Sequence, residues 1–260
     1  MHRPVTTNWA AGRYEAVGER IAPIADEVLD AAARRTPLRG ATLVDLACGT
    51  GSAALSATAR GAAVTGVDIT SELIALAAGK PGGSTVTWVT ADAADTGLKT
   101  ASFDVAVSNM GIIFVPPDRQ VAELARLLKP GGVLSFSAWI RTDENPFSDP
   151  VAEVLGPPPA GFSPDQWGDA ETLTERLTPH FDAIDLIRGL HPWEFDSPAT
   201  ALHFLRTESP VHVEIFRRAG PARRERLAAA FRSALRPHAG PAGTVGFTAP
   251  YVIVTARRRG

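Results

Sequence analysis

Residues 41–68 constrain the fold most, because two short apolar runs there flank a glycine-containing turn and a short helical segment. The first run, "ATLVDLA", is continuously apolar, as strands buried on both faces of a parallel sheet are. "SAALSATARG" follows with helical composition and stops at Gly61. The second run, "AAVTGVD", ends at Asp68. Two strands joined by a crossover helix form a βαβ unit, so this stretch predicts a parallel α/β sheet.

The same alternation continues along the chain. "TSELIALAAG" and "RQVAELARLLKPGG" have the composition and the end signals of helices. Further strands are predicted at 85–92, 103–109 and 133–140. A helix with apolar spacing precedes them over 13–35, where Pro23 is expected to kink or split it. Strands and helices that alternate with short connections predict an α/β fold with a doubly wound Rossmann-like sheet.

The regular alternation of strands and helices stops after Ile140, which predicts a second part of the chain. Residues 141–168 hold "GPPP" and many turn formers, typical of a long connection. A helix and strand material follow, and "FTAPYVIVTARRR" reads as the last strand. We expect the core to comprise 36–196 and 246–260, with a mainly helical cap at 197–245 inserted before the last strand.

Composition narrows the class of protein. The formal net charge of −2 gives no field that favours nucleic acid or an anionic membrane. Cys48 is the one cysteine, which excludes an internal disulfide and fits a reducing compartment. The start of the chain lacks the apolar region of a signal peptide, and no apolar run approaches about 18 residues. These features predict a cytoplasmic globular protein without a nucleic-acid or membrane partner, and no metal site is predicted.

Acidic residues end three successive predicted strands, next to a glycine turn. Gly49 and Gly51 belong to a relaxed G-x-G-x-x-A pattern, which dinucleotide enzymes share and which also serves simply to pack a helix on a strand. Asp68 could accept from both hydroxyls of a ribose. Asp45 suits a ligand with an ammonium group better than one with a pyrophosphate. Asp92 would lie beside an adenine amino group, so the pattern predicts a nucleoside-containing ligand.

Five motifs in order, "VDLACGTG", "GVDIT", "TADAAD", "FDVAVSN" and "LLKPGG", resemble those of class I S-adenosylmethionine-dependent methyltransferases. The similarity covers about residues 40–140 and is greatest to the small-molecule branch that includes ubiquinone- and menaquinone-pathway enzymes. "YVIVTARRR" resembles the antiparallel last strand of that family. The resemblance implies a methyltransferase of the EC 2.1.1 class, with S-adenosylmethionine as cofactor and S-adenosylhomocysteine as product.

The resemblance also implies roles for residues at the methionine end of the cofactor. Ala47, Gly49 and Gly51 would let the backbone approach the methionine part. Asp45 would act on its amino group, through water, and Asn109 would lie nearby.

Other residues are implied at the nucleoside end and in a lid. Asp68 would bind the ribose and Ile69 would pack on the adenine, whose edge would meet Asp92 and Ala93. "NWAAGRY" resembles the N-terminal lid of this branch, which we place at 1–35 as a helical lid. Tyr14, or Arg13 beside it, would reach the methionine carboxylate, although Tyr14 could equally anchor a helix on the core.

Methyl transfer is an in-line displacement, for which alignment of the reacting atoms is the main demand. A base is needed only where the acceptor must lose a proton, and the candidates are His191, His203 and His212. Each of them could also be an ordinary buried or surface histidine. Aromatic side chains are candidates to line an apolar acceptor pocket, or to form core: Trp139, Phe147, Trp193 and Phe204.

The sequence predicts S-adenosylmethionine-dependent methyl transfer to a small, fairly apolar metabolite. "SNMG" follows the fourth predicted strand, where enzymes that methylate base amines carry an Asn/Asp-Pro-Pro-aromatic motif, so a nucleic-acid acceptor is disfavoured. A nicotinamide-dependent oxidoreductase and a catalytically inactive cofactor-binding partner protein stay open as alternatives. The acceptor atom, the pathway and the oligomeric state stay open as well.

Overall fold

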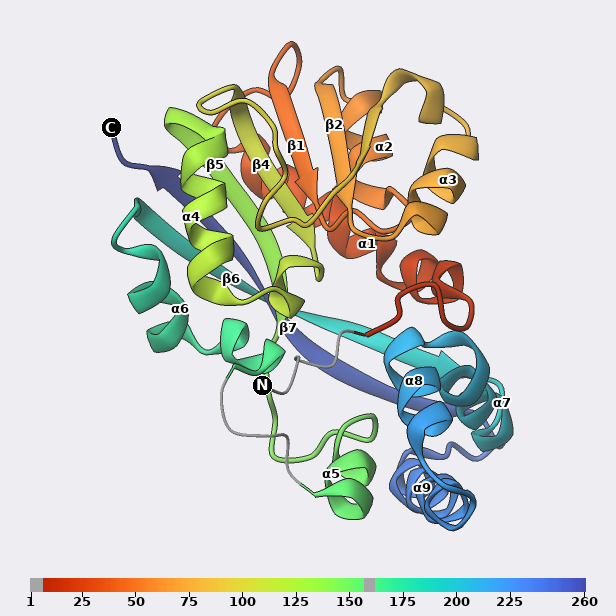
Figure 1. Cartoon of the computed structure of the whole chain (residues 1–260). Helices are drawn as coiled ribbons and strands as arrows, with labels where there is room; N and C mark the ends of the chain where they lie inside the picture. The colour runs from red at the N-terminus through yellow and green to blue at the C-terminus, as the bar shows by residue number, and fades with distance from the viewer. Residues whose placement is uncertain (1–6, 157–161) are drawn as a thin grey trace. The chain divides into compact units, whose positions relative to one another are not determined.

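The order β3-β2-β1-β4-β5-β7-β6 describes a single seven-stranded sheet in the computed structural model of the chain (Figure 1). The structure describes residues 7–156 and 162–260, so most of "GPPP" and the first six residues of the expected lid lie outside the described part. β1 pairs in parallel with β2 and β4, β2 with β3, and β4 with β5. β7 is antiparallel to β5. The predicted fold class, mostly parallel with an antiparallel last strand, is confirmed.

Most strands lie close to the predicted positions, but β5 begins at Leu128, five residues before the predicted start, in a segment expected to end a helix. Their bounds are β1 Thr42–Leu46, β2 Ala63–Asp68, β3 Thr87–Thr90, β4 Phe103–Asn109, β5 Leu128–Trp139, β6 Phe181–Phe195 and β7 Val245–Arg258. The central strands are apolar because helices cover both of their faces. In Figure 1, α4 (Pro117–Leu127) lies in front of β4 and β5, whereas α1 (Tyr14–Ala33) and α2 (Ser52–Ala59) lie behind the sheet. α3 (Ser71–Gly79) leads from β2 toward β3.

Helix α1 runs unbroken, and the expected split at Pro23 does not occur. Proline removes one backbone donor from the helix, but apolar burial on both sides of it holds the helix together. Ile24, Val28 and Leu29 are all at most 1% exposed. Burial of this apolar stripe therefore outweighs the local cost of the proline.

The chain divides into two compact units, which we call the core unit and the second unit. The core unit consists of Gly18–Arg141, Phe162–Gly189 and Pro250–Gly260, and the second unit of Met1–Val17, Thr142–Gly161 and Leu190–Ala249. The expected lid at 1–35 is divided between the two units, because its part from residue 18 onward packs on the sheet. Asn109 Nδ2 donates to the carbonyl of Ile21 at 3.0 Å, and Ser135 Oγ donates to that of Val28 at 2.8 Å.

The second unit is largely helical, as the sequence predicts for 197–245. Its helices are α5 Asp149–Leu155, α7 Pro198–His203, α8 Pro210–Arg218 and α9 Pro221–Leu235, with a π-helical turn at Phe204–Glu208. The N-terminal segment is fixed to this turn, because Arg13 N–H donates to the carbonyl of Glu208 at 3.0 Å and the two side chains form an ion pair. Within the described residues, no helix has both the length and the apolar character to cross a membrane.

Candidate cofactor site

The turn between β1 and α2 has a backbone that glycine favours. Gly49 and Gly51 have φ of 54° and 82°, and Ala47 also has a positive φ, 52°. Gly51 precedes the first residue of α2, and a Cβ on it would lie only 2.7 Å from Cη2 of Trp88. Both the backbone conformation and the neighbouring indole therefore favour glycine at position 51.

Asp68 ends β2 and is tied to the glycine turn. Its Oδ2 accepts the N–H of Gly49 at 2.8 Å, and its Oδ1 accepts the N–H of Thr70 at 2.9 Å. Burial raises the pKa of Asp68, and the hydrogen bonds from Thr70 and Gly49 oppose that rise. A carboxylate has about four lone-pair positions, so two hydrogen bonds leave capacity for the hydroxyls of a ligand.

Asp45, on the neighbouring strand β1, is 1% exposed and only partly bonded. Its Oδ2 accepts the N–H of Ala54 in α2 at 2.9 Å, whereas the buried Oδ1 has no hydrogen-bond partner. Burial raises the pKa of Asp45 to about 8, which the bond from Ala54 opposes and the charge of Asp68 reinforces. A buried acceptor without a donor is costly, and a cationic donor from a ligand would satisfy it.

The end of β4 approaches the same turn. A Cβ on Gly111 would lie 2.5 Å from the carbonyl oxygen of Ala47, so only glycine allows this approach. Asn109 is held at both ends of its amide, because its Oδ1 accepts from Ser137 Oγ at 2.8 Å and its Nδ2 donates to Ile21. The Asn109 side chain therefore has a fixed orientation at the strand end.

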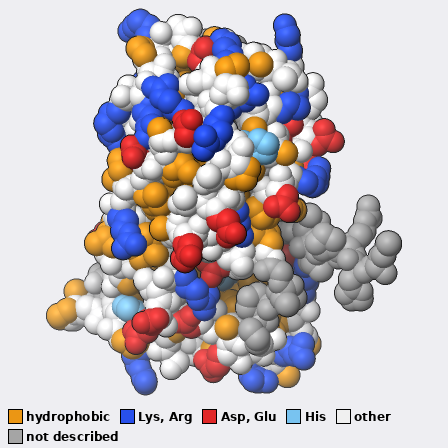
Figure 2. Space-filling view, turned by 90° about the vertical axis from the view of Figure 1, so that its left-hand side faces the viewer, with side chains coloured by type: hydrophobic (Ala, Val, Ile, Leu, Met, Phe, Trp, Pro, Cys, Tyr) orange, Lys and Arg blue, Asp and Glu red, His pale blue; other side chains and the backbone are white. Residues whose placement is uncertain are grey.

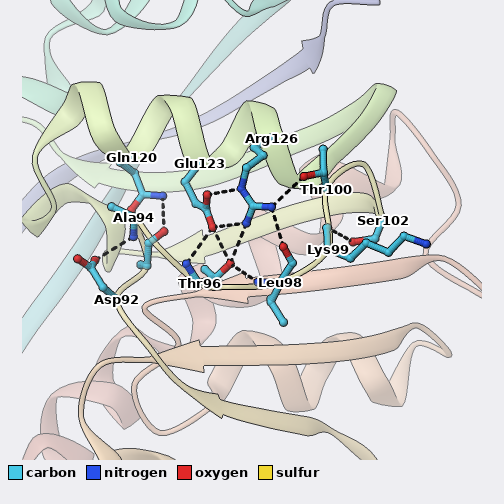
Figure 3. Close-up of polar contacts among 11 residues, drawn as sticks. Asp92, Ala94, Thr96, Leu98, Lys99, Thr100, Ser102, Gln120, Glu123 and Arg126 are labelled. Carbon is cyan, nitrogen blue, oxygen red and sulfur yellow. Dashed lines mark hydrogen bonds and ion pairs between the residues drawn. The ribbon is translucent and has the colours of Figure 1, made fainter.

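The loop after β3, which carries Asp92 and Ala93, is fastened to α4 (Figure 3). Gln120 Nε2 donates to the carbonyl of Ala93 at 3.1 Å. Glu123 Oε1 accepts from the N–H of Thr96 at 2.9 Å and from its hydroxyl at 2.6 Å. Burial of Glu123 is outweighed by hydrogen bonds from Arg126 and Thr96, which lower the pKa of Glu123 to about 2.

The same loop presents one acid and one apolar position at its start. Asp92 Oδ1 accepts the N–H of Ala94 at 2.9 Å, and Oδ2 pairs with Arg119 at 3.2 Å. Ala93 is buried.

Ile69, which directly follows Asp68 at the end of β2, is 60% exposed. Such exposure is unusual for an isoleucine and leaves apolar surface for a ligand.

Cys48 lies within the turn but has the surroundings of a structural thiol. Its N–H donates to the carbonyl of Val67 at 3.0 Å. Burial, followed by the charges of Asp45 and Asp68, raises the pKa of the Cys48 thiol well above its usual value. A thiol held in its neutral form is a poor nucleophile.

The three candidate histidines all lie in the second unit, in different settings. His212 Nε2 lies 2.9 Å from the carbonyl of Phe147, and Nδ1 lies 2.8 Å from Ser209 Oγ. Because a carbonyl only accepts, Nε2 carries the proton and Nδ1 accepts from the serine. Burial lowers the pKa of His212 to about 4, against the hydrogen bond to Phe147. His203 is exposed on α7, and His191 is buried in β6.

The aromatic candidates divide between the two units. Phe147, Trp193 and Phe204 form one cluster in the second unit, with ring centroids of Phe147 at 5.1 Å from Trp193 and 6.2 Å from Phe204. Trp193 and Phe204 are buried, whereas Phe147 is half-buried. Trp139 belongs to the core unit, where its ring meets Tyr251 edge-on at 6.4 Å.

Tyr14 begins α1 and belongs to the second unit, together with Trp9, whose ring centroid lies 6.4 Å away. The contact suits an aromatic anchor at the helix start. Its proposed role toward the cofactor stays a prediction.

Some residues around the turn were missed by sequence reasoning. Gln120, Glu123 and Arg126 lie on a predicted helix, but only their spacing at i, i+3 and i+6 signals a shared face. Lys80 Nζ donates to the carbonyl of Thr50 at 3.0 Å across 30 residues, and no local pattern predicts that bond.

Comparison with known proteins identifies the family. The family model described as "Methyltransferase domain" matches residues 44–136, the segment that carries the turn and the three acids. An uncharacterized protein of Mycobacterium tuberculosis is 31% identical over 198 residues, which cover 72% of this chain and 70% of that protein. The chain belongs to the S-adenosylmethionine-dependent methyltransferases. Its cofactor is S-adenosylmethionine, as predicted.

Relatives with assigned names are similar over shorter stretches. The methyltransferase is 35% identical to a demethylmenaquinone methyltransferase of Clavibacter sepedonicus over 98 residues, 37% of this chain and 40% of that one. It is 31% identical to an O-methyltransferase of Pyrenophora dematioidea over 173 residues, 61% and 62% of the two chains.

Solved structures share the fold at low sequence identity. A putative methyltransferase from Bacillus halodurans superposes with a TM-score of 0.59 at 14% identity, covering 91% of the methyltransferase and 99% of that chain. Phosphoethanolamine N-methyltransferase 2 of Haemonchus contortus, in complex with S-adenosyl-L-methionine, gives a TM-score of 0.55 at 18% identity, over 90% and 53% of the chains.

The residues of the turn fit this cofactor. The buried, unbonded Asp45 Oδ1 suits the ammonium group of its methionine part. The space beside Gly51 is occupied by the Trp88 indole and that beside Gly111 by Ala47, so both glycines let the turn pack closely on its neighbours. Both observations come from the core unit alone.

Proposed function

We propose that the methyltransferase transfers a methyl group to a small, fairly apolar metabolite by in-line displacement, with alignment as the main source of acceleration. The single observation that carries the proposal is the buried Asp45 carboxylate with one unbonded oxygen beside the glycine turn. The ammonium of S-adenosylmethionine would stabilise the ionised form of this carboxyl group, whereas the pyrophosphate of a nicotinamide dinucleotide, the cofactor of the rival oxidoreductase, would not.

The bound cofactor would supply an electrophilic methyl group on a sulfonium, and the chain would hold its two ends. Asp45 would accept from the ammonium group, while the backbone of Ala47, Gly49 and Gly51 lies along the methionine part. Asn109, whose amide is fixed by Ser137 and Ile21, would form the wall near that end.

The nucleoside end would be held by the next two strand ends. Asp68 would accept from the ribose hydroxyls with the lone pairs that Gly49 and Thr70 leave free. The exposed Ile69 side chain would cover one face of the adenine. Asp92 and Ala93, on the loop fastened to α4, would meet the adenine edge.

Acceptor binding is proposed for the aromatic cluster of the second unit. Phe147, Trp193 and Phe204 offer apolar surface without a charge among them, and Phe147 is half-buried. Two relatives, a demethylmenaquinone methyltransferase and an O-methyltransferase, favour a small-molecule acceptor. Figure 2 shows acidic, basic and apolar side chains interspersed on one face of the molecule, without a continuous basic area on that face.

No histidine is required by this proposal. His212 uses both ring nitrogens in hydrogen bonds, and its low pKa makes it a weak base. His191 and His203 stay candidates for an acceptor that must lose a proton, such as a hydroxyl.

A methyl-transfer assay with labelled S-adenosylmethionine and a panel of phenols, quinols, small amines and carboxylic acids tests the proposal. We expect turnover with at least one apolar acceptor of this panel, and none with short RNA or DNA. Turnover restricted to nucleic acid or protein acceptors would contradict the proposed acceptor class. Binding of the cofactor without turnover on any acceptor would favour the inactive-partner alternative.

A further inference from the structure

The indole of Trp88 lies between β2 and the glycine turn, in space that two glycines leave free. Trp88 is on β3, beside Gly66 of β2 in the parallel register. A Cβ on Gly66 would lie 2.4 Å from Cζ3 of the indole, and one on Gly51 would lie 2.7 Å from Cη2. The ring therefore crosses Gly66, and its far edge contacts Gly51.

The polar end of the indole is fixed on the other side. Trp88 Nε1 donates to the carbonyl of Gly83 at 2.8 Å, in the short 3-10 turn Gly83–Thr85 that follows α3. Gly83 is itself confined, because a Cβ there would lie 2.4 Å from the carbonyl oxygen of Ala78. The ring is thus held at both ends, which fixes where its far edge meets the turn.

A second contact to the turn comes from the same connection between α3 and β3. Lys80 directly follows α3 and donates from Nζ to the carbonyl of Thr50 at 3.0 Å. Thr50 is 2% exposed, so this charged hydrogen bond is made to a buried carbonyl. The turn is accordingly contacted by Lys80 at Thr50 and by Trp88 at Gly51.

We infer that Trp88 and Lys80 are positioning residues for cofactor binding. They fix the position and orientation of the backbone of residues 48–51. They act on the backbone that approaches the cofactor and need not touch the cofactor itself. The backbone of Gly66 is not in the left-handed region, so its conformation does not require glycine. Glycine is required there because a side chain would clash with the indole.

A double-mutant cycle between Gly66 and Trp88 tests the inference. Gly66→Ala should push the indole against Gly51 and raise the Kd for S-adenosylhomocysteine by about tenfold, whereas in a Trp88→Leu background the same change should cost less than about threefold. Val89→Ala, on the same strand, controls for general weakening of β3. An equal cost of Gly66→Ala in both backgrounds would overturn the role of the ring. Trp88→Phe serves as the milder variant if Trp88→Leu does not fold.

Lys80→Met should raise the same Kd by roughly three- to tenfold, as expected for a lost charged hydrogen bond, and Lys80→Arg should restore it. Lys99→Met removes the same charge from an exposed position and is the control. Amide exchange at Gly49 and Gly51 should be faster in Lys80→Met before ligand is added. In turnover, KM for S-adenosylmethionine should rise while kcat stays nearly unchanged.

The outcomes separate this inference from the cofactor assignment. If the wild-type chain does not bind S-adenosylhomocysteine, the assignment of the cofactor fails. If the wild type binds it, but Lys80→Met leaves both Kd and the exchange of Gly49 and Gly51 unchanged, the positioning role of Lys80 is overturned.

Discussion

The carboxylate of Asp68 accepts the backbone N–H of Gly49 at 2.8 Å, so the acid at the end of β2 holds the turn at the end of β1. The two residues lie on adjacent parallel strand ends. The acid expected to bind a ribose therefore also fixes the backbone beside it, so a change of this side chain should affect both ligand binding and local structure.

Asp68→Ala should weaken binding of S-adenosylhomocysteine by roughly 1.5–3 kcal/mol, the usual scale for a hydrogen bond to a charged group. It should also lower the free energy of unfolding by about 1–3 kcal/mol, because the N–H groups of Gly49 and Thr70 lose their acceptor. Calorimetry and urea unfolding measure the two effects. Asp68→Asn, which keeps one acceptor, should show a smaller loss of stability, and an unchanged affinity in both variants would place the ligand elsewhere.

Asp45 should make the free protein less stable as the pH rises. Its pKa is about 8 in the folded chain and 3.8 when unperturbed, so between these values the folded state keeps a proton that the unfolded state has lost. The contribution of Asp45 to the free energy of unfolding should fall with rising pH in this window, by at most about 1.4 kcal/mol per pH unit.

Asp45→Asn removes this titration and is the matched variant. Urea unfolding of both proteins at pH 5.5, 7 and 8.5 should show that the difference in stability grows with pH in favour of the variant. The same variant should bind S-adenosylhomocysteine more weakly, because the ammonium group loses its anionic partner. Parallel stability profiles would show that Asp45 does not titrate in this range.

His212 should act on stability in the opposite sense. Its pKa is about 4 in the folded chain against an ordinary 6.5, so the unfolded state binds a proton first as the pH falls. The contribution of His212 to the free energy of unfolding should therefore decrease from pH 6.5 toward pH 4, and the difference in stability between the wild type and His212→Gln across this range measures it.

His212→Ala should destabilise the second unit by about 2–4 kcal/mol, since it leaves a cavity beside Phe147 and removes two hydrogen bonds. His203→Ala, at an exposed position, should change stability by less than about 0.5 kcal/mol. Turnover per folded molecule should stay near the wild-type value in His212→Ala. A loss of about 10²-fold or more at full folding would instead identify His212 as a base.

Glu123 should affect the affinity for the cofactor, because it holds the loop after β3 that is proposed to contact the adenine. Glu123→Gln weakens the acceptor for Thr96 and the ion pair with Arg126, so S-adenosylhomocysteine should bind about three- to tenfold more weakly. Because the pKa of Glu123 is about 2, its contribution to stability should be lost as the pH falls from about 4.5 toward 2. Calorimetry with Lys99→Met as control checks the affinity, and an unchanged Kd would separate this loop from the site.

The sequence predicted the features that have a local pattern. Continuous apolar runs marked the central strands, and the glycines with Asp45, Asp68 and Asp92 marked the strand ends where we propose that the cofactor binds. These signals suffice because a parallel sheet brings the ends of its neighbouring strands to one edge.

Contacts that depend on three-dimensional approach were not predictable. The position of the Trp88 ring over Gly66 depends on the register of β2 and β3, and Lys80 reaches Thr50 across a helix. The unbroken α1 also required knowledge of burial, because a proline in a helix is unfavourable until packing around Ile24 and Val28 is counted. Such contacts depend on tertiary structure and produce no periodic pattern in the sequence.

One measurement tests the central claim most directly: calorimetric titration of the wild-type chain with S-adenosylhomocysteine, and separately with NAD and NADP. The account predicts saturable one-to-one binding of S-adenosylhomocysteine, a matching rise in Tm, and neither effect with the two dinucleotides. Binding of NAD or NADP without any binding of S-adenosylhomocysteine would contradict it.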